Sequence, residues 1–200
     1  NDAFNRLAIT AALAAREVEW CRAFYTYLRQ VGTKYTSATV VDALGGAASI
    51  TRALMDMFCA RHDPAFSGDR EKGEGAAAEA IRVGLASVVA INDDRVLRLF
   101  RSLVDAILRT NAFAPAAQEA LAFKIDSALV PGLPKPVPWR EIFVFSSRVE
   151  GIHLRAGPVA RGGLRWSDRR DDYRTEILGL MKAQRVKNAV IVPTGAKGGF

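Results

Sequence analysis

The residues that could do chemistry gather at the end of the chain, in the segment VKNAVIVPTGAKGGF. Lys197 stands there between small residues, with Gly195 and Ala196 before it and Gly198 and Gly199 after it. Glycine has no Cβ, so a ligand or another backbone can approach it closely. A lysine crowded by other cations in a partly desolvated pocket favours its neutral form, and a neutral amine accepts protons. The pattern therefore fits a proton-carrying lysine, although a Gly-rich turn taken alone more commonly carries a solvated lysine.

A helix is expected before this segment, from about residue 168 to residue 185, followed by a short apolar strand, KNAVIVP. Its apolar face recurs at steps of three and four residues: Tyr173, Ile177, Leu180 and Met181. The same steps continue to Gln184 and then Lys187. An unpaired buried amide or ammonium is costly. These two side chains therefore either line a cleft or turn outward into solvent.

A second cationic glycine segment contains Gly162 and Gly163 beside Arg161. We interpret both Gly-rich segments as turns that place a cation next to approachable backbone. Arginine can hold a carboxylate through paired N–H bonds, and lysine acts as a point charge. We expect Arg161, Lys187 and Lys197 to hold a small molecule with two anionic groups.

The elements that must position these residues fall into two kinds. Apolar residues spaced by three and four dominate the first 110 residues, which is typical of helices. The expected helices span residues 3–30, 39–61 with a break at Gly45 and Gly46, 76–91, and a further helix capped by Asn92 with Asp93 and Asp94 at its positive end. We expect an exposed loop over residues 62–75. The apolar face of the last of these helices carries Val96, Phe100, Leu103 and Ile107.

After residue 120 the apolar period becomes two, which indicates strands. These are expected around 123–125, over 141–145 and over 149–155, the last two as a hairpin, with the Pro-rich connector PGLPKPVP before them. His153 falls on the polar face of its strand and is expected at the surface. The fold class is therefore mixed α+β. A helical region over residues 1–118 precedes the beginning of an α/β domain over residues 119–200.

The amino-acid composition limits the classes of protein to which the chain can belong. Half of the 200 residues are hydrophobic, enough for a sizeable core, and no run approaches the roughly 20 apolar residues of a membrane span. The net charge is +7, and from Arg140 onward 12 Lys and Arg face 6 Asp and Glu, so any preference for anions belongs to the last third. The chain begins with Asn and ends in a Gly-rich segment, so we interpret it as an interior fragment of a longer protein.

Cysteine and glycine usage excludes several kinds of site. Cys21 and Cys59 are the only cysteines, and with two histidines they suit neither a disulfide framework nor a metal site. Cys21 falls in an apolar helical series and is expected as a packed thiol, and a reducing cytoplasm follows as a mild inference. Neither a Walker loop nor a G-x-G-x-x-G occurs. No cofactor-binding residue is therefore expected within the chain.

The segment VARGGLRWSDRRDDYRTEILGLMKAQRVKNAVIVPTGAKGGF, with REIFVFSSRVEGIHLRAG upstream, resembles the NAD-specific glutamate dehydrogenases of the large bacterial class. The resemblance covers residues 123–200, and ALMDMFCARHDP and ILRTNAF are similar too. It implies oxidative deamination of L-glutamate to 2-oxoglutarate and ammonia with NAD as hydride acceptor. It also makes residues 119–200 the start of a substrate-binding domain, and it places the NAD domain beyond Phe200.

The resemblance also implies roles for single residues. Lys197 corresponds to the catalytic lysine, and Lys187 and Gln184 to substrate-binding residues. Arg161 stands where the small hexameric glutamate dehydrogenases have a substrate lysine. The 200 residues alone are expected to be inactive, and the full-length protein is expected to be a cytoplasmic homo-oligomer without nucleic-acid or membrane partners.

Two other classes of function remain open at this point. One is a basic module that binds nucleic acid through its arginine-rich last third, although Asp168, Asp171, Asp172 and Glu176 interrupt the arginines. The other is a helical assembly or regulatory region, for which the first 115 residues would suffice.

Overall fold

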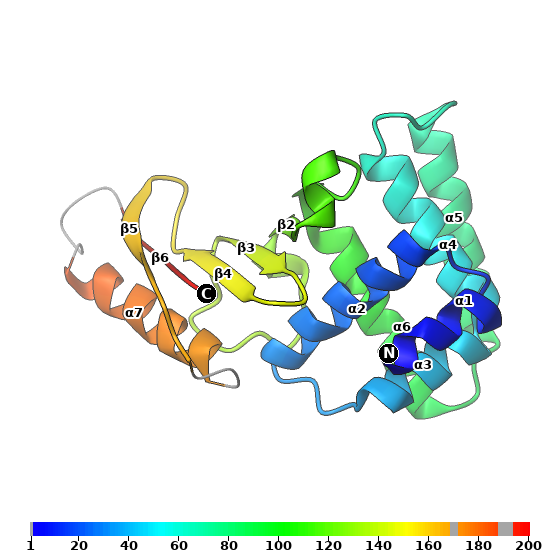
Figure 1. Ribbon diagram of the computed structural model, residues 1–200, viewed down its shortest axis with the longest axis horizontal. Coiled ribbons are helices and arrows are strands. Elements are labelled where there is room, and N and C mark those ends of the chain that lie inside the picture. Colours follow the sequence, from blue (N-terminus) through cyan, green and yellow to red (C-terminus); the bar gives the residue numbers. More distant parts are fainter. Residues whose placement is uncertain (1, 169–171, 188–193) are drawn as a thin grey trace. The chain divides into compact units, whose positions relative to one another are not determined.

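The computed structural model describes residues 2–168, 172–187 and 194–200 (Figure 1). The chain divides into two compact units, one of Asn1–Arg29 with Thr33–Asp105 and one of Gln30–Gly32 with Ala106–Phe200. Within the described ranges the first unit is helical and the second holds the strands. The expected mixed α+β class is therefore confirmed. The expected domain boundary between residues 118 and 119 stays a prediction.

The first unit is built on an aromatic core. The Trp20 and Phe58 ring centroids lie 4.9 Å apart, and Phe24 meets Phe58 edge-on at 5.6 Å. Cys21 is fully buried beside them, as expected of a packed thiol. No helix in the described part of either unit is long and apolar enough to cross a bilayer. The helical elements of this unit are the 3-10 turn Ala3–Arg6 and helices α1 (Leu7–Thr10), α2 (Ala15–Gln30), α3 (Ser37–Gly46), α4 (Ala48–His62), α5 (Arg70–Ala86) and α6 (Ile91–Ala106).

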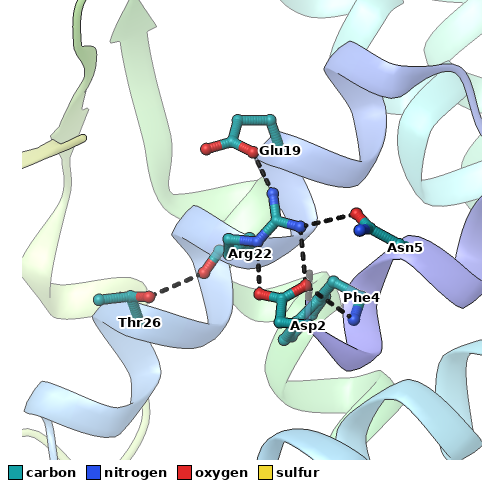
Figure 2. Close-up of polar contacts among 6 residues, drawn as sticks. All are labelled: Asp2, Phe4, Asn5, Glu19, Arg22 and Thr26. Carbon is teal, nitrogen blue, oxygen red and sulfur yellow. Dashed lines mark hydrogen bonds and ion pairs between the residues drawn. The ribbon is translucent and has the colours of Figure 1, made fainter. Parts of the chain in front are cut away.

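The expected continuous helix over residues 3–30 is wrong, because the chain breaks between α1 and α2. Ala12 adopts a positive φ of 49° there, and the Glu17 carboxylate accepts the amide of Ala14 at 2.8 Å. Figure 2 shows how the segment before the break is held against α2. The Arg22 guanidinium donates to Asp2 at 2.7 and 2.8 Å, to Asn5 at 3.1 Å and to Glu19. The break therefore depends on polar contacts that an apolar pattern does not reveal.

Two other helix boundaries differ from expectation. Helix α5 begins at Arg70, because Asp69 caps it by accepting the amide of Lys72 at 3.2 Å, so part of the expected loop is helical. Asn92 does not cap α6 but lies inside its first turn, together with the expected acidic pair. Ile107, expected on the face of that helix, instead begins the first strand. The break at Gly45 and Gly46 is confirmed, since α3 ends at Gly46.

The second unit is a six-stranded mixed sheet in the order β1-β2-β3-β4-β6-β5. The strands β1 to β4 pair antiparallel in sequence, which confirms the expected hairpin of β3 and β4. β6 then lies between β4, to which it is antiparallel, and β5, to which it is parallel. The strands and helix of this unit are β1 (Ile107–Thr110), β2 (Leu121–Ile125), β3 (Arg140–Phe145), β4 (Glu150–Arg155), β5 (Ala160–Arg165), α7 (Tyr173–Lys187) and β6 (Thr194–Gly199), with 3-10 turns at Pro115–Gln118 and Ser127–Leu129.

The two Gly-rich segments are strands, β5 and β6, and not the turns that we expected. The glycines serve close packing between strands. A Cβ on Gly198 would lie 2.8 Å from Cδ2 of Leu164 and 3.0 Å from the carbonyl oxygen of Ile152, closer than side-chain atoms normally come. Because Gly198 has no side chain, β6 can pack closely between β4 and β5.

Helix α7 begins at Tyr173, five residues after the start that we expected. Its predicted apolar face is largely confirmed: Tyr173, Ile177 and Met181 are buried and Leu180 is half-buried. The helix contacts β4 and β6 and lies alongside them in Figure 1. The strand expected over residues 187–193 lies, apart from Lys187, outside the described residues.

Candidate functional site

Lys197 occupies the middle of β6, flanked by a strand on each side. It pairs with Leu154 of β4 and with Gly163 of β5. Residues that face one another across neighbouring strands project from the same side of a sheet. Its side chain is half-buried, and its Nζ lies 3.9 Å from the point where a Cβ on Gly163 would stand. The amine therefore lies over a position where β5 has no side chain.

The same side of the sheet is covered by α7. Leu154 is fully buried on it, and the register continues from Leu154 to Glu141 of β3. Nη2 of Arg174, in the first turn of α7, donates to Oε2 of Glu141 at 2.7 Å. Glu141, Leu154, Lys197 and Gly163 thus form one cross-strand row beneath the helix. Lys197 is thereby half-buried on the side of the sheet that α7 covers.

The other three expected site residues lie on strand β5 and helix α7. Arg161 pairs with Gly195, two residues along the strands from the pair of Gly163 and Lys197. Gln184 lies half-buried in the last turn of α7, and Lys187 is the last residue of that helix. The side chains of Arg161 and Lys187 belong to the part of the chain that the structure does not describe. The structure therefore brings the strand of Arg161 beside Lys197, and the meeting of the three cations stays a prediction.

The opposite side of the sheet has a different character. His153 lies there half-buried, and burial, followed by the nearby Arg155, lowers its pKa, so it is neutral near pH 7. A cavity of about 180 Å³ beside it is lined mainly by apolar residues, among them Ile142, Leu164 and Phe200. His153 pairs with Gly198, the residue next to Lys197, and successive side chains of a strand point to opposite sides of the sheet. His153 therefore projects to the side opposite Lys197. We assign it no part in the site.

Sequence reasoning missed the buried ion pair of Glu141 and Arg174. Their side chains are 0% and 4% exposed, and Ser127 also donates to Oε1 of Glu141 at 3.1 Å. A signal for Glu141 was present, since it shares the period-two face of Phe143 and Phe145, both buried. A carboxylate on a buried strand face needs a buried partner. Arg174 follows the buried Tyr173 directly and gave no comparable signal.

Metal ions and dinucleotides each need a particular arrangement of residues. Within the described ranges no group of three or more His, Cys, Asp or Glu is arranged to hold a metal ion. Gly73 and Gly75 form a G-x-G pair, but both lie inside α5 instead of in a strand-to-helix turn. A dinucleotide pyrophosphate is bound at such a turn, so this pair does not fit it.

Comparison with protein families gives two matches to the chain. The model for the catalytic domain of bacterial NAD-glutamate dehydrogenase matches residues 80–200. The model for helical motif 3 of glutamate dehydrogenase matches residues 1–64. Together they account for most of the chain, and the helical-motif match falls on a part of the chain that is helical.

Relatives of high similarity carry one name. NAD-specific glutamate dehydrogenase of Mycobacterium tuberculosis is 50% identical over 205 residues, which cover 100% of this chain. The proteins of that name from Halomonas elongata and Pseudomonas aeruginosa are 51% and 48% identical over 207 residues, again 100% of this chain. The chain spans 13% of the length of each of these relatives.

Proposed function

Because the chain belongs to the bacterial NAD-glutamate dehydrogenase family, whose catalytic-domain model matches residues 80–200, we propose that it is part of an enzyme that oxidises L-glutamate to 2-oxoglutarate and ammonia. The relatives named above support NAD as hydride acceptor. The observation that carries the proposal is the position of Lys197, whose amine lies over Gly163 on the side of the sheet covered by α7. The nucleic-acid and assembly alternatives are not favoured, since both family matches describe parts of this enzyme.

Lys197 is the proposed catalytic residue. When the hydride leaves Cα of glutamate, the substrate becomes an iminium ion. Water then adds to that carbon with loss of a proton, and ammonia leaves after its nitrogen has been protonated. A neutral amine within hydrogen-bond reach can take a proton from the water and later return one to the departing nitrogen. The absent side chain at Gly163 leaves space for the reacting carbon beside the amine.

The substrate-binding roles rest on the resemblance and on element positions. We assign one carboxylate of glutamate to Arg161 and the other to Lys187 with Gln184. The proximity of β5 to Lys197 in the register supports Arg161, and the position of Gln184 in the last turn of α7 is compatible with its role. A bidentate arginine would fix the direction of its carboxylate more strictly than a lysine.

The described residues form no dinucleotide-binding turn for NAD, and we propose that a part of the protein beyond Phe200 binds it. The 200 residues alone are accordingly expected to be inactive. We also propose a homo-oligomer in the cytoplasm, without nucleic-acid or membrane partners. Two free cysteines, which suit a reducing compartment, support the location.

The test is Lys197→Ala in the full-length protein. We expect glutamate-dependent NAD reduction to fall by at least ~10³-fold, because alanine at this position cannot carry a proton. NAD affinity, measured by fluorescence titration, should stay within ~2-fold, since the lysine does not hold the cofactor. Retained turnover would reject the catalytic role. A wild-type protein that reduces NAD with another amino acid but not with glutamate would reject the substrate.

A further inference from the structure

The buried ion pair of Glu141 and Arg174 has no part in the proposed chemistry. Its side chains are 0% and 4% exposed, with Nη2 of Arg174 at 2.7 Å from Oε2 of Glu141. Ser127 donates to the other oxygen, Oε1, at 3.1 Å. The contact joins the first turn of α7, the middle sheet strand β3 and the 3-10 turn that contains Ser127. Three separate segments of the second unit thus meet at one carboxylate.

Stability alone does not account for this pair. Taking two charges out of water costs about as much as their attraction returns, and an apolar pair of similar volume often stabilises a core equally well. An ion pair adds a fixed relative orientation of its two side chains, because its hydrogen bonds form only in one geometry. The apolar contacts of Ile177 and Met181, both fully buried, do not by themselves define where the helix sits along its axis.

The row of residues beneath α7 connects the pair with the site. Glu141 is opposite Leu154, and Leu154 is opposite Lys197, so the pair and the proposed catalytic amine stand in one cross-strand row. The helix is thereby fixed against the same row that places Lys197. Gln184 lies ten residues after Arg174, or ~15 Å along the helix at 1.5 Å per residue. A displacement of the helix at its first turn would move that substrate residue relative to the amine.

We propose that Glu141 and Arg174 are positioning residues, which set the axial position of α7 so that Gln184 and the end of the helix meet the substrate at the correct distance from Lys197. This inference rests on the proposed function. This role requires no contact of the pair with substrate or cofactor. It acts through the helix.

The decisive variant in the full-length enzyme is the double substitution Glu141→Leu with Arg174→Met. It removes both charges together, so no unpaired charge stays buried. We expect an unfolding midpoint within ~3 °C of wild type, with kcat/KM for glutamate reduced ~10- to 100-fold, since a shift of about 1 Å has effects of that size. The KM for NAD should not change. The matched control is Glu79→Leu with Arg82→Met, an exposed pair on α5 that should leave all constants unchanged.

Wild-type constants in a folded double variant would overturn the proposal and leave the pair with a structural role alone. If the double variant does not fold, Arg174→Lys is the variant to test, because lysine keeps the positive charge but loses the planar guanidinium group. A raised KM for glutamate supports the proposal, and an unchanged KM overturns it. Hydrogen exchange of the last turn of α7 reports, without turnover, how firmly that turn is held. Faster exchange there in the folded variant supports the proposal even if wild-type protein proves inactive with glutamate, which would refute only the proposed function.

Discussion

Gly163→Ala would fill the space beside the proposed catalytic amine of Lys197 without lowering the stability of the fold. Among the described residues, a Cβ at this position would have one neighbour within 4 Å, Nζ of Lys197 at 3.9 Å, and would meet no described backbone atom. Gly163 is not among the described glycines with positive φ, so alanine suits its backbone. Such a change stabilises by about 0.4–1 kcal/mol, because the unfolded chain loses freedom. The fold should therefore be as stable as wild type or slightly more stable.

Activity should move in the opposite direction. A reacting carbon must lie ~3–3.5 Å from the group that acts on it, and a displacement of about 1 Å can cost ~100-fold in rate. The methyl group would occupy the space next to the amine, so we expect kcat/KM for glutamate to fall ~100-fold, equivalent to about 2.7 kcal/mol of transition-state stabilisation.

The assay is glutamate-dependent NADH formation by the full-length enzyme, with the unfolding midpoint measured on the same samples. Gly75→Ala on α5 is the control, because a Cβ there meets nothing within 4 Å. Wild-type kcat/KM in folded Gly163→Ala would show that substrate does not use the space over β5, and the assignment of Lys197 would lose its geometric basis.

Three further predictions concern packing and ionisation. Gly198→Ala should lower stability by about 1–3 kcal/mol in urea unfolding, because its Cβ would come within 3.0 Å of the carbonyl oxygen of Ile152; an unchanged midpoint would contradict the packing. Burial raises the pKa of Glu17, but hydrogen bonds from Arg52 and from the Ala14 amide outweigh it, so the folded pKa lies below 4.5. The ion pair of Glu17 with Arg52 therefore stabilises the protein above pH 4.5, and this stabilisation is lost as pH falls through the folded pKa of Glu17. Glu17→Gln should lower the free energy of unfolding by about 2 kcal/mol at pH 7 and by much less at pH 3. An equal loss at both pH values would refute this prediction. Burial raises the pKa of Cys21 to about 12 and that of Cys59 to about 11, so mass spectrometry should find little alkylation by iodoacetamide at pH 8 until urea is added, and rapid native labelling would contradict the burial.

The sequence predicted the features that depend on apolar periodicity. Strand β3 alternates buried side chains with half-buried or exposed ones, and α7 carries Ile177 and Met181 one turn apart, so each pattern is visible in a single window. The structure confirmed these elements within one to five residues. The break before α2 was not visible, since it depends on Glu17 and Arg22, whose partners cannot be identified from spacing.

The Gly-rich strands could not be recognised for a different reason. Glycine has no side chain, so β6 shows no alternation, and its low strand propensity favours a turn. Its strand character comes from pairing with β4 and β5, which is a tertiary effect. Lys197 was predicted as a site residue from its chemistry and from the resemblance, and its role stays a prediction. Its partner in the row, Glu141, required the sheet register.

The most direct test of the account is a structure of the full-length enzyme with 2-oxoglutarate bound. The account predicts the carbonyl carbon within ~3.5 Å of Nζ of Lys197, over Gly163, with one carboxylate on Arg161 and the other near Gln184 and Lys187. A diacid bound elsewhere, or one whose carbonyl carbon lies more than about 6 Å from that amine, would contradict it.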